Sequence, residues 1–221
     1  MHSDSGRAAK VSDETQAPPS GGGWNSQLVI TTILLAMVLE ALALGSSIVT
    51  IGLPSILKEF PTDQGGWLLT TYYLAGAIAA PVLGKMADLY GKRRMLLIAL
   101  AISVAGGVIC ALPVNFEMLI AGRALQGVIM ATMSLSYSLI RDVFPPKPAA
   151  FAASITVTGM GAFSLVAPSL IGWLVNNWGF RGMFTFDVVW TMALLIGIAI
   201  VTPESPLRRA AKPDLLGAVF L

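Results

Sequence analysis

The chain has 221 residues, of which 55% are hydrophobic and only 12% are charged, and its net charge is +2. A soluble domain usually carries about 25% charged residues, so this composition excludes an ordinary soluble protein. The few cations are dispersed in short segments, which gives no support to nucleic-acid binding.

Cysteine and histidine are each present once, as Cys110 and His2. One cysteine excludes an internal disulfide, and we interpret Cys110 as a packing residue in an apolar run. His2 lies in the leading tail, so we expect no histidine-based metal site or catalytic group. We also expect no cofactor.

The chain begins with residues 1–26, which are polar, mixed in charge and end in PPSGGG. This composition predicts a disordered cytoplasmic tail. Long uncharged stretches follow, and about 20 mainly apolar residues suffice for a helix to cross a bilayer. We therefore expect a six-span bundle over 27–203, with spans at about 27–52, 66–84, 95–113, 118–140, 149–174 and 183–202. Residues 204–221 are predicted to form a basic cytoplasmic linker and the start of a seventh span.

The lysines and arginines indicate how the spans are oriented. With the N-terminus inside, eleven of the 14 cations fall on the inner side, Arg123 falls within a span, and only Lys58 and Arg181 fall outside. Short cytoplasmic loops carry such an excess of cations. We expect a multi-pass integral protein of a bacterial inner (cytoplasmic) membrane, with its N-terminus in the cytoplasm and lipid around it.

Glu40 lies near the middle of the first span. A carboxylate at that depth costs at least a few kcal/mol, even on the most lenient insertion scale. Met37, Ala43, Leu44 and Ser47 share its helical face. Glu40 is either a hydrogen-bonded structural acid or a carboxyl that binds a proton or cation and faces an interior cavity, and the second interpretation is favoured.

Arg123 lies in the outer third of the fourth span. A guanidinium stays protonated, so it needs a partner, water or a route to the interface. Glu40 is one candidate, although it lies roughly 10 Å away along the membrane normal. Asp187 in the sixth span is closer in depth and is the other candidate for an ion pair. A polar stripe continues along the same face of the fourth span, through Gln126, Gly127, Met130, Ser134 and Tyr137.

The fifth span is rich in small residues, and they predict close helix packing, with a kink at Pro168. They include Gly159, Gly161, Ala167 and Gly172. Close packing alone would explain this composition without a role in transport.

The most charged loop is GKMADLYGKRR, residues 84–94. Its cations are worth about 1 kcal/mol each near an anionic membrane surface, which explains their place but not Asp88 or the two glycines. Gly84, Asp88, Gly91, Lys92 and Arg93 match the pattern Gly-x-x-x-Asp-x-x-Gly-Lys/Arg-Lys/Arg. That pattern belongs to the loop between the second and third spans of major facilitator superfamily transporters.

Other segments extend the resemblance over about 27–221. They are SIVTIGLP (47–54), WLLTTYYLAG (67–76), GRALQG (122–127), whose arginine is Arg123, and KPDLLGA (212–218). The chain resembles the N-terminal half of such a transporter, and most of all the fourteen-span drug:proton antiporter family.

Two features depart from that family's pattern. The family usually has an acid nine residues before the proline at position 54, where this chain has Gly45. Glu40 lies about 140° further around the helix, so it need not inherit that role. The exporter motif Gly-x-x-x-Gly-Pro-x-x-Gly-Gly appears only as Phe163, Ala167, Pro168, Ile171 and Gly172.

The resemblance implies an all-α membrane fold whose six helices form two inverted three-helix repeats, with substrate bound near the midplane between two halves. Two residues are predicted to couple protons to transport: Arg123, which matches the buried arginine of the family's fourth span, and Glu40, because it is a carboxyl inside the membrane. Five residues are expected to line the cavity: Ser47, Gln126, Met130, Ser134 and Tyr137. Loop 84–94 is expected to gate the inner side, where Asp88 meets the positive end of a helix in the other half.

The function implied is proton-coupled export of lipophilic or amphipathic compounds, of the multidrug efflux type. Its partners would be the small-molecule substrate, protons, and a missing C-terminal half or another half-transporter. One alternative is a proton-coupled carrier of a hydrophilic metabolite or organic anion, held by Arg123 and Tyr137. Another is a non-transporting membrane partner or sensor. An enzyme is not expected, because the glycine-rich segments lie in the tail and inside a span rather than in a phosphate loop.

Overall fold

The computed structural model describes residues 26–204, and every element in this part of the chain is a helix. The predicted tail up to residue 25, and the linker and seventh span from residue 205 on, lie outside the described residues. The elements are α1 (Ser26–Glu59), α2 (Trp67–Tyr90), α3 (Lys92–Ala111), α4 (Phe116–Gly127), the 3₁₀ turn η1 (Val128–Met130), α5 (Ala131–Val143) and α6 (Pro146–Val201).

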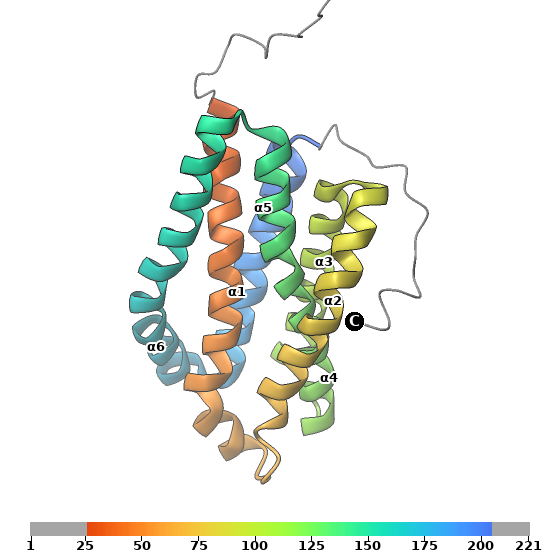
Figure 1. Ribbon diagram of the computed structural model, residues 1–221. Helices are drawn as coiled ribbons and strands as arrows, with labels where there is room; N and C mark the ends of the chain where they lie inside the picture. The colour runs from red at the N-terminus through yellow and green to blue at the C-terminus, as the bar shows by residue number, and fades with distance from the viewer. Residues whose placement is uncertain (1–25, 205–221) are drawn as a thin grey trace, which may run out of the picture.

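Helix α6 consists of two limbs joined at Gly179, where φ is 66° and ψ is −170°. A residue without a Cβ adopts this backbone conformation readily, so the chain reverses there without a longer loop. Figure 1 shows the first limb (146–178) running along the bundle and the second limb (180–201) returning beside α1. With α4, η1 and α5 forming one span, all six expected spans are present as helices.

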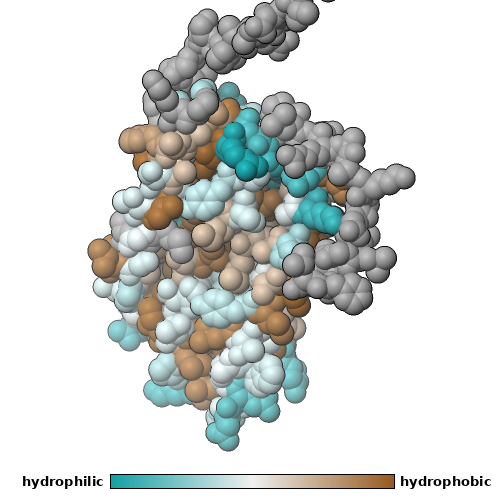
Figure 2. Space-filling view, in the orientation of Figure 1, coloured by the Kyte–Doolittle hydropathy of each residue, from teal (hydrophilic) through white to brown (hydrophobic). Residues whose placement is uncertain are grey.

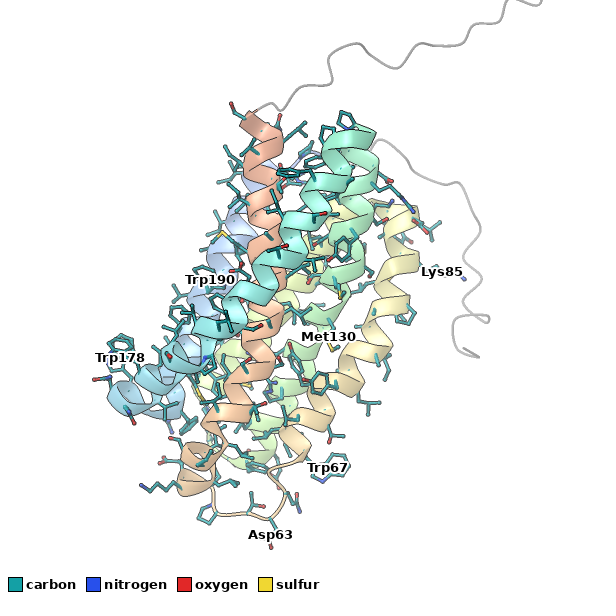
Figure 3. All side chains as sticks on the ribbon, turned by 60° about the vertical axis from the view of Figure 1, so that its left-hand side comes forward. Asp63, Trp67, Lys85, Met130, Trp178 and Trp190 are labelled. Atoms are coloured by element: carbon teal, nitrogen blue, oxygen red, sulfur yellow. The ribbon has the colours of Figure 1, made fainter. Side chains whose placement is uncertain are left out.

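The bundle has two ends, which we name by what they carry. The loop end holds the connection between α2 and α3, and the elbow end holds Gly179 and the connection between α1 and α2 (Figures 1 and 3). The start of α1 and the end of α6 both lie at the loop end, where the Gln27 side-chain amide donates to the carbonyl of Val201 at 3.0 Å. The chain between residues 26 and 204 therefore runs the length of the bundle an even number of times.

The helix surfaces suit a lipid environment. Figure 2 shows hydrophobic and weakly polar residues across the middle of one face, with hydrophilic residues gathered at its two ends. Large apolar side chains face outward, including Leu165 (82% exposed) and Ile200 (77% exposed). Inside, one apolar cluster around Leu96, Leu135 and Ile198 fills the half nearer the loop end. A second, around Ile48, Leu119 and Phe184, fills the other half.

Several span boundaries differ from the expected ones, most of all at the ends of the first two spans. The second span is expected to end near residue 84, but α2 continues to Tyr90 and α3 begins at Lys92, so only Gly91 of the expected loop 84–94 lies between helices. The first span is expected to end near residue 52, but α1 continues through Pro54 to Glu59. Pro54 is exposed, so its ring has room, and the helix loses only one backbone hydrogen bond there. The fourth span is interrupted by η1. A 3₁₀ turn winds more tightly than an α-helix, and over three residues it rotates the following side chains by about 60°.

Candidate functional site

Glycines bring α4 against the backbones of two neighbouring helices. An added Cβ at Gly127 would overlap the carbonyl oxygen of Tyr72 in α2. On another side of α4, a Cβ at Gly122 would lie 2.6 Å from the Cys110 sulfur and 2.9 Å from the Gly106 carbonyl oxygen of α3. Small residues of this kind permit close backbone approach. The segment GRALQG therefore packs closely between α2 and α3, and the side chains of Arg123 and Gln126 are buried there.

Arg123 is fully buried, so its side chain does not extend to the membrane interface. Its Nε donates to the Leu68 carbonyl oxygen at 3.3 Å, and its Nη1 donates to Gln126 Oε1 at 2.8 Å. Its guanidinium carbon lies 4.1 Å from the centre of the Tyr72 ring. This cation–π contact and the two hydrogen bonds hold the charge inside the bundle.

Gln126 connects Arg123 to the buried Asp187 of the second limb of α6. Its Nε2 donates to Asp187 Oδ2 at 2.9 Å, while its Oε1 accepts from the arginine. Arg123 Nη2 and Asp187 Oδ1 are both buried without a hydrogen-bond partner among the described residues. Of the two acids considered as partners for Arg123, Asp187 is the one linked to it, through an amide bridge. We call these three residues the polar chain.

Glu40 lies away from the polar chain. It is partly exposed and has no hydrogen bond or ion pair within the described bundle. Its Oε1 lies 3.1 Å from the position that a Cβ on Gly159 would occupy, so it faces the first limb of α6. The absence of a side chain at Gly159 leaves room for the carboxyl. The structure thus places Glu40 and Arg123, the two residues expected to couple protons, in different parts of the bundle.

The polar stripe on the fourth span divides at η1. Gln126 is buried, Met130 and Tyr137 are partly buried, and Ser134 is exposed. The rotation introduced by η1 explains why residues spaced for one α-helical face do not share one environment. Ser47 on α1 is partly buried, and its hydroxyl donates to the Ala43 carbonyl oxygen at 2.9 Å. That these five residues line a cavity stays a prediction.

Tyr72 is a site residue that sequence reasoning did not single out. Its hydroxyl donates to the Leu42 carbonyl oxygen at 3.2 Å, and an added Cβ at Gly45 would lie 3.0 Å from that hydroxyl. The space at position 45, where the resembling family usually has an acid, is thus taken by the tyrosine that also covers Arg123. The segment WLLTTYYLAG contains Tyr72, but nothing in its periodicity indicates these partners.

Loop 84–94, which is helical in the structure except at Gly91, is bound to the ends of two other spans. Lys92 is buried and forms an ion pair with Asp142 of α5, and its Nζ also lies 3.5 Å from the Ser138 carbonyl oxygen. The Arg93 backbone N–H donates to Glu204 Oε1 at 3.1 Å, and the Arg93 guanidinium donates to the Ala199 carbonyl oxygen. Lys92 and Arg93 therefore join helix ends, in addition to their expected effect on orientation.

The two glycines and the acid of this loop have distinct surroundings. Gly91 adopts φ 106° and ψ 138° between α2 and α3, and a Cβ there would lie 2.8 Å from Glu204 Oε1. A Cβ at Gly84 would meet no atom within 4 Å. Asp88 is exposed and has no partner among residues 26–204. Its expected contact with another half stays a prediction.

The small residues of the fifth span also differ among themselves. Ala167 is buried in the cluster near the elbow end, and Pro168 is exposed. A Cβ at Gly161 or Gly172 would meet no atom within 4 Å, so these two glycines serve no close contact within the described bundle. That these positions serve close helix packing stays a prediction. No group of three or more His, Cys, Asp or Glu side chains that could hold a metal gathers in the described residues.

Comparison with known proteins gives matches to one superfamily of transporters. The family model of the Major Facilitator Superfamily matches residues 33–219. An uncharacterized MFS-type transporter of Mycobacterium tuberculosis is 34% identical over 197 residues, covering 87% of this chain and 28% of the relative. Multidrug resistance protein Stp of the same organism is 30% identical over 200 residues, covering 89% of this chain and 37% of that protein. The chain thus spans roughly a third of the length of these relatives.

Solved structures show the same fold. A bacterial homolog of the human lysosomal transporter Spinster, in an inward-facing and occupied conformation, matches with a TM-score of 0.72 at 18% identity. The match covers 89% of this chain and 49% of that chain. Since the family model extends over nearly all of the described bundle, the chain belongs to the major facilitator superfamily of membrane transporters.

Proposed function

We propose that this chain is the N-terminal half of a proton-coupled exporter of lipophilic or amphipathic compounds. Two observations support the proposal: one relative is a multidrug resistance protein, and the chain spans only 37% of its length. The excess of cations at the loop end supports placing that end and the N-terminus in the cytoplasm, in a bacterial inner membrane.

The observation that carries the proposal is Glu40, a carboxyl near the middle of a membrane span that is partly exposed and has no partner among the described residues. An ionised carboxyl at that depth is costly, so an acid inside a membrane span is by default a candidate functional group. In our proposal it takes up a proton from one side and releases it to the other as access alternates. One proton that moves down about 100 mV and one pH unit releases about 3.7 kcal/mol, enough to drive export against a gradient.

The polar chain has the second role in the proposal. Arg123 and Asp187 each keep one buried polar atom without a partner, so the bridge through Gln126 leaves room for a different pairing. We propose that this pairing changes when the bundle switches state, which links α4 to the second limb of α6. Since Arg123 is fully buried, an anionic substrate would have to open the contact between α2 and α4 to reach it. We therefore do not favour an organic-anion carrier.

Loop 84–94 has a gating role in the proposal. Lys92 and Arg93 fix the loop to the ends of α5 and α6, while Asp88 is exposed. A carboxylate in this position can meet the positive end of a helix. We propose that this helix belongs to a C-terminal half or to another half-transporter, and that the contact closes the cytoplasmic side.

Transport of ethidium into inside-out membrane vesicles tests the proposal. The vesicles come from cells that express the chain with whatever continuation its reading frame has, and respiration acidifies their interior. We expect energised uptake that a protonophore abolishes, and that Glu40→Gln reduces at least about tenfold. Glu117→Gln, which neutralises an exposed acid at the start of α4, should keep wild-type uptake. If Glu40→Gln transports with an unchanged pH dependence, the proposed role of Glu40 is wrong.

A further inference from the structure

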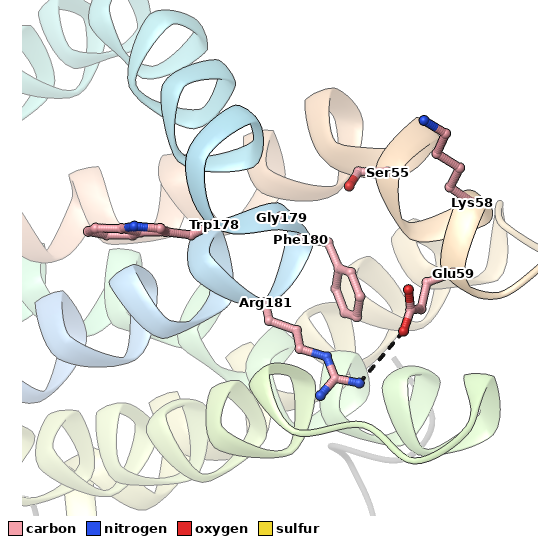
Figure 4. A pocket seen from close by; sticks show the side chains of 7 residues that line it. All are labelled: Ser55, Lys58, Glu59, Trp178, Gly179, Phe180 and Arg181. Atoms are coloured by element: carbon pink, nitrogen blue, oxygen red, sulfur yellow. Dashed lines mark ion pairs between the residues drawn. The ribbon is translucent and has the colours of Figure 1, made fainter.

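A hollow of about 350 Å³ lies at the elbow end, between the end of α1 and Gly179. Ser55, Lys58 and Glu59 line it from the end of α1, and Arg181 lines it from beyond the elbow. Figure 4 shows Glu59 directed toward Arg181, and the Lys58 ammonium directed away from it. In the orientation proposed above, Lys58 and Arg181 are the only two cations of the sequence on the outer side of the membrane. Both cations therefore line the same hollow, although they are more than a hundred residues apart in the chain.

The charges in this hollow do not cancel. Arg181 lies 3.9 Å from Glu59, and both side chains are about half exposed, so this is a loose surface pair. Lys58 is exposed and has no ion-pair or hydrogen-bond partner among the described residues. Two cations and one anion leave a charge of +1. The Ser55 hydroxyl adds a hydrogen-bond donor, so the lining matches a group with one negative charge and several oxygen acceptors.

An apolar groove of about 440 Å³ adjoins the hollow, and Trp178 lines both. The groove continues along the second limb of α6, past Gly182 and Phe186 to Val189. Gly182 leaves space for the Trp178 side chain, because an added Cβ at position 182 would overlap it. Phe186 stacks on Trp190 with ring centres 6.1 Å apart, which fixes the groove wall. The groove thus runs from the charged hollow toward the middle of the membrane.

Two exposed tryptophans place this end of the groove at the edge of the membrane. Trp173 and Trp178 meet edge to face, with ring centres 5.5 Å apart, and they are 54% and 63% exposed. Tryptophan concentrates at the headgroup level, where its apolar ring and its N–H both find partners. The charged hollow therefore lies at headgroup depth and the groove lies at acyl-chain depth.

We propose that the hollow and the groove together bind one glycerophospholipid of the leaflet that faces the elbow end. Arg181 and Ser55 hold the phosphodiester together with Lys58, whose exposed side chain turns toward Arg181 for this contact. One acyl chain lies in the groove past Phe186 and Val189. The single negative charge of a phosphodiester matches the charge of +1 in the hollow. A free phosphate would leave the groove empty, which is why we assign the site to a lipid. In the orientation proposed above, this is the outer leaflet.

Native mass spectrometry of the full chain in detergent tests the site, with three probes offered separately. We expect retention of one phosphatidylglycerol molecule, and no retention of diacylglycerol with the same acyl chains or of glycerol 3-phosphate. Each cation near a membrane surface changes lipid affinity about fivefold, so Lys58→Gln with Arg181→Gln should weaken phosphatidylglycerol retention about 25-fold. Arg94→Gln, which removes an exposed cation at the other end of the bundle, should leave it unchanged.

Charge-preserving variants separate loss of the site from loss of the fold. Lys58→Arg with Arg181→Lys should retain the lipid within about twofold of wild type, because both charges remain. Retention of diacylglycerol as strong as that of phosphatidylglycerol would overturn the proposal, since it would indicate a nonspecific apolar coat. Strong binding of glycerol 3-phosphate would overturn the assignment to a lipid. Equal retention by the Gln variants and wild type would refute the role of the cations.

Discussion

The conformation of Gly91 gives the sharpest prediction about how loop 84–94 is built. Replacing Gly91 with alanine should destabilise the bundle for two reasons. The backbone there has φ 106°, which an L-residue with a Cβ rarely adopts, and the new Cβ would lie 2.8 Å from Glu204 Oε1. The carboxylate would have to move away, and the Arg93 backbone N–H that it accepts from at 3.1 Å would lose its partner.

The size of the effect follows from these two terms. A non-glycine residue in such a backbone region costs about 1–3 kcal/mol. Losing a hydrogen bond to a charged group costs about 1.5–3 kcal/mol, at the lower end here because Glu204 is only partly buried. We therefore expect Gly91→Ala to lower the free energy of unfolding by about 2.5–4.5 kcal/mol.

Reversible unfolding in mixed detergent micelles, followed by far-ultraviolet circular dichroism, measures this difference. Gly84→Ala is the matched control in the same segment, because it lies within α2 and a Cβ there would meet nothing within 4 Å. Alanine is favoured over glycine inside a helix by about 1 kcal/mol, so Gly84→Ala should be neutral or stabilising. Equal stability of Gly91→Ala and wild type, or an equal loss in both variants, would refute the reasoning.

The other predictions use the same unfolding assay. Asp142→Asn should lower the free energy of unfolding by about 3 kcal/mol, because it leaves the buried Lys92 cation without its ion pair. A loss under about 0.5 kcal/mol would contradict this prediction. Gln126→Leu should lower the free energy of unfolding by about 2–3 kcal/mol, since Arg123 and Asp187 would both be buried with fewer hydrogen-bond partners. An unchanged free energy would mean that the bridge is not formed. Gly45→Ala should cost about 1 kcal/mol when Tyr72 is present and become neutral or stabilising in Tyr72→Phe, which removes the hydroxyl 3.0 Å from the new Cβ. A cost unchanged by Tyr72→Phe would show that this contact is not the cause.

The architecture was accessible from sequence because it depends on local composition. Uncharged stretches of about 20 residues predict the spans, and their existence does not depend on which neighbours they contact. Helix ends were less accessible, as at Pro54, because a proline on an exposed helix face need not end the helix. The reversal at Gly179 needs no separate loop, so the break between the last two spans is shorter than the sequence suggests.

The site was accessible only in part, because its contacts join residues far apart in the chain. Depth alone indicated that Asp187 is nearer to Arg123 than Glu40 is, but the bridge through Gln126 depends on how α4 and α6 pack. The contact between Tyr72 and Arg123 leaves no periodic signal in either helix. Helical spacing also assigned Gln126 and Ser134 to one face, and the 3₁₀ turn between them separates their environments.

Proton release on ligand binding tests the central claim most directly. The purified protein, expressed with whatever continuation its reading frame has, is placed in weakly buffered detergent solution, and ethidium is added while the pH is followed. If Glu40 exchanges its proton for a cationic compound, wild type should release protons on addition of ethidium, and Glu40→Gln should release none. Equal proton release by wild type and Glu40→Gln would contradict the account.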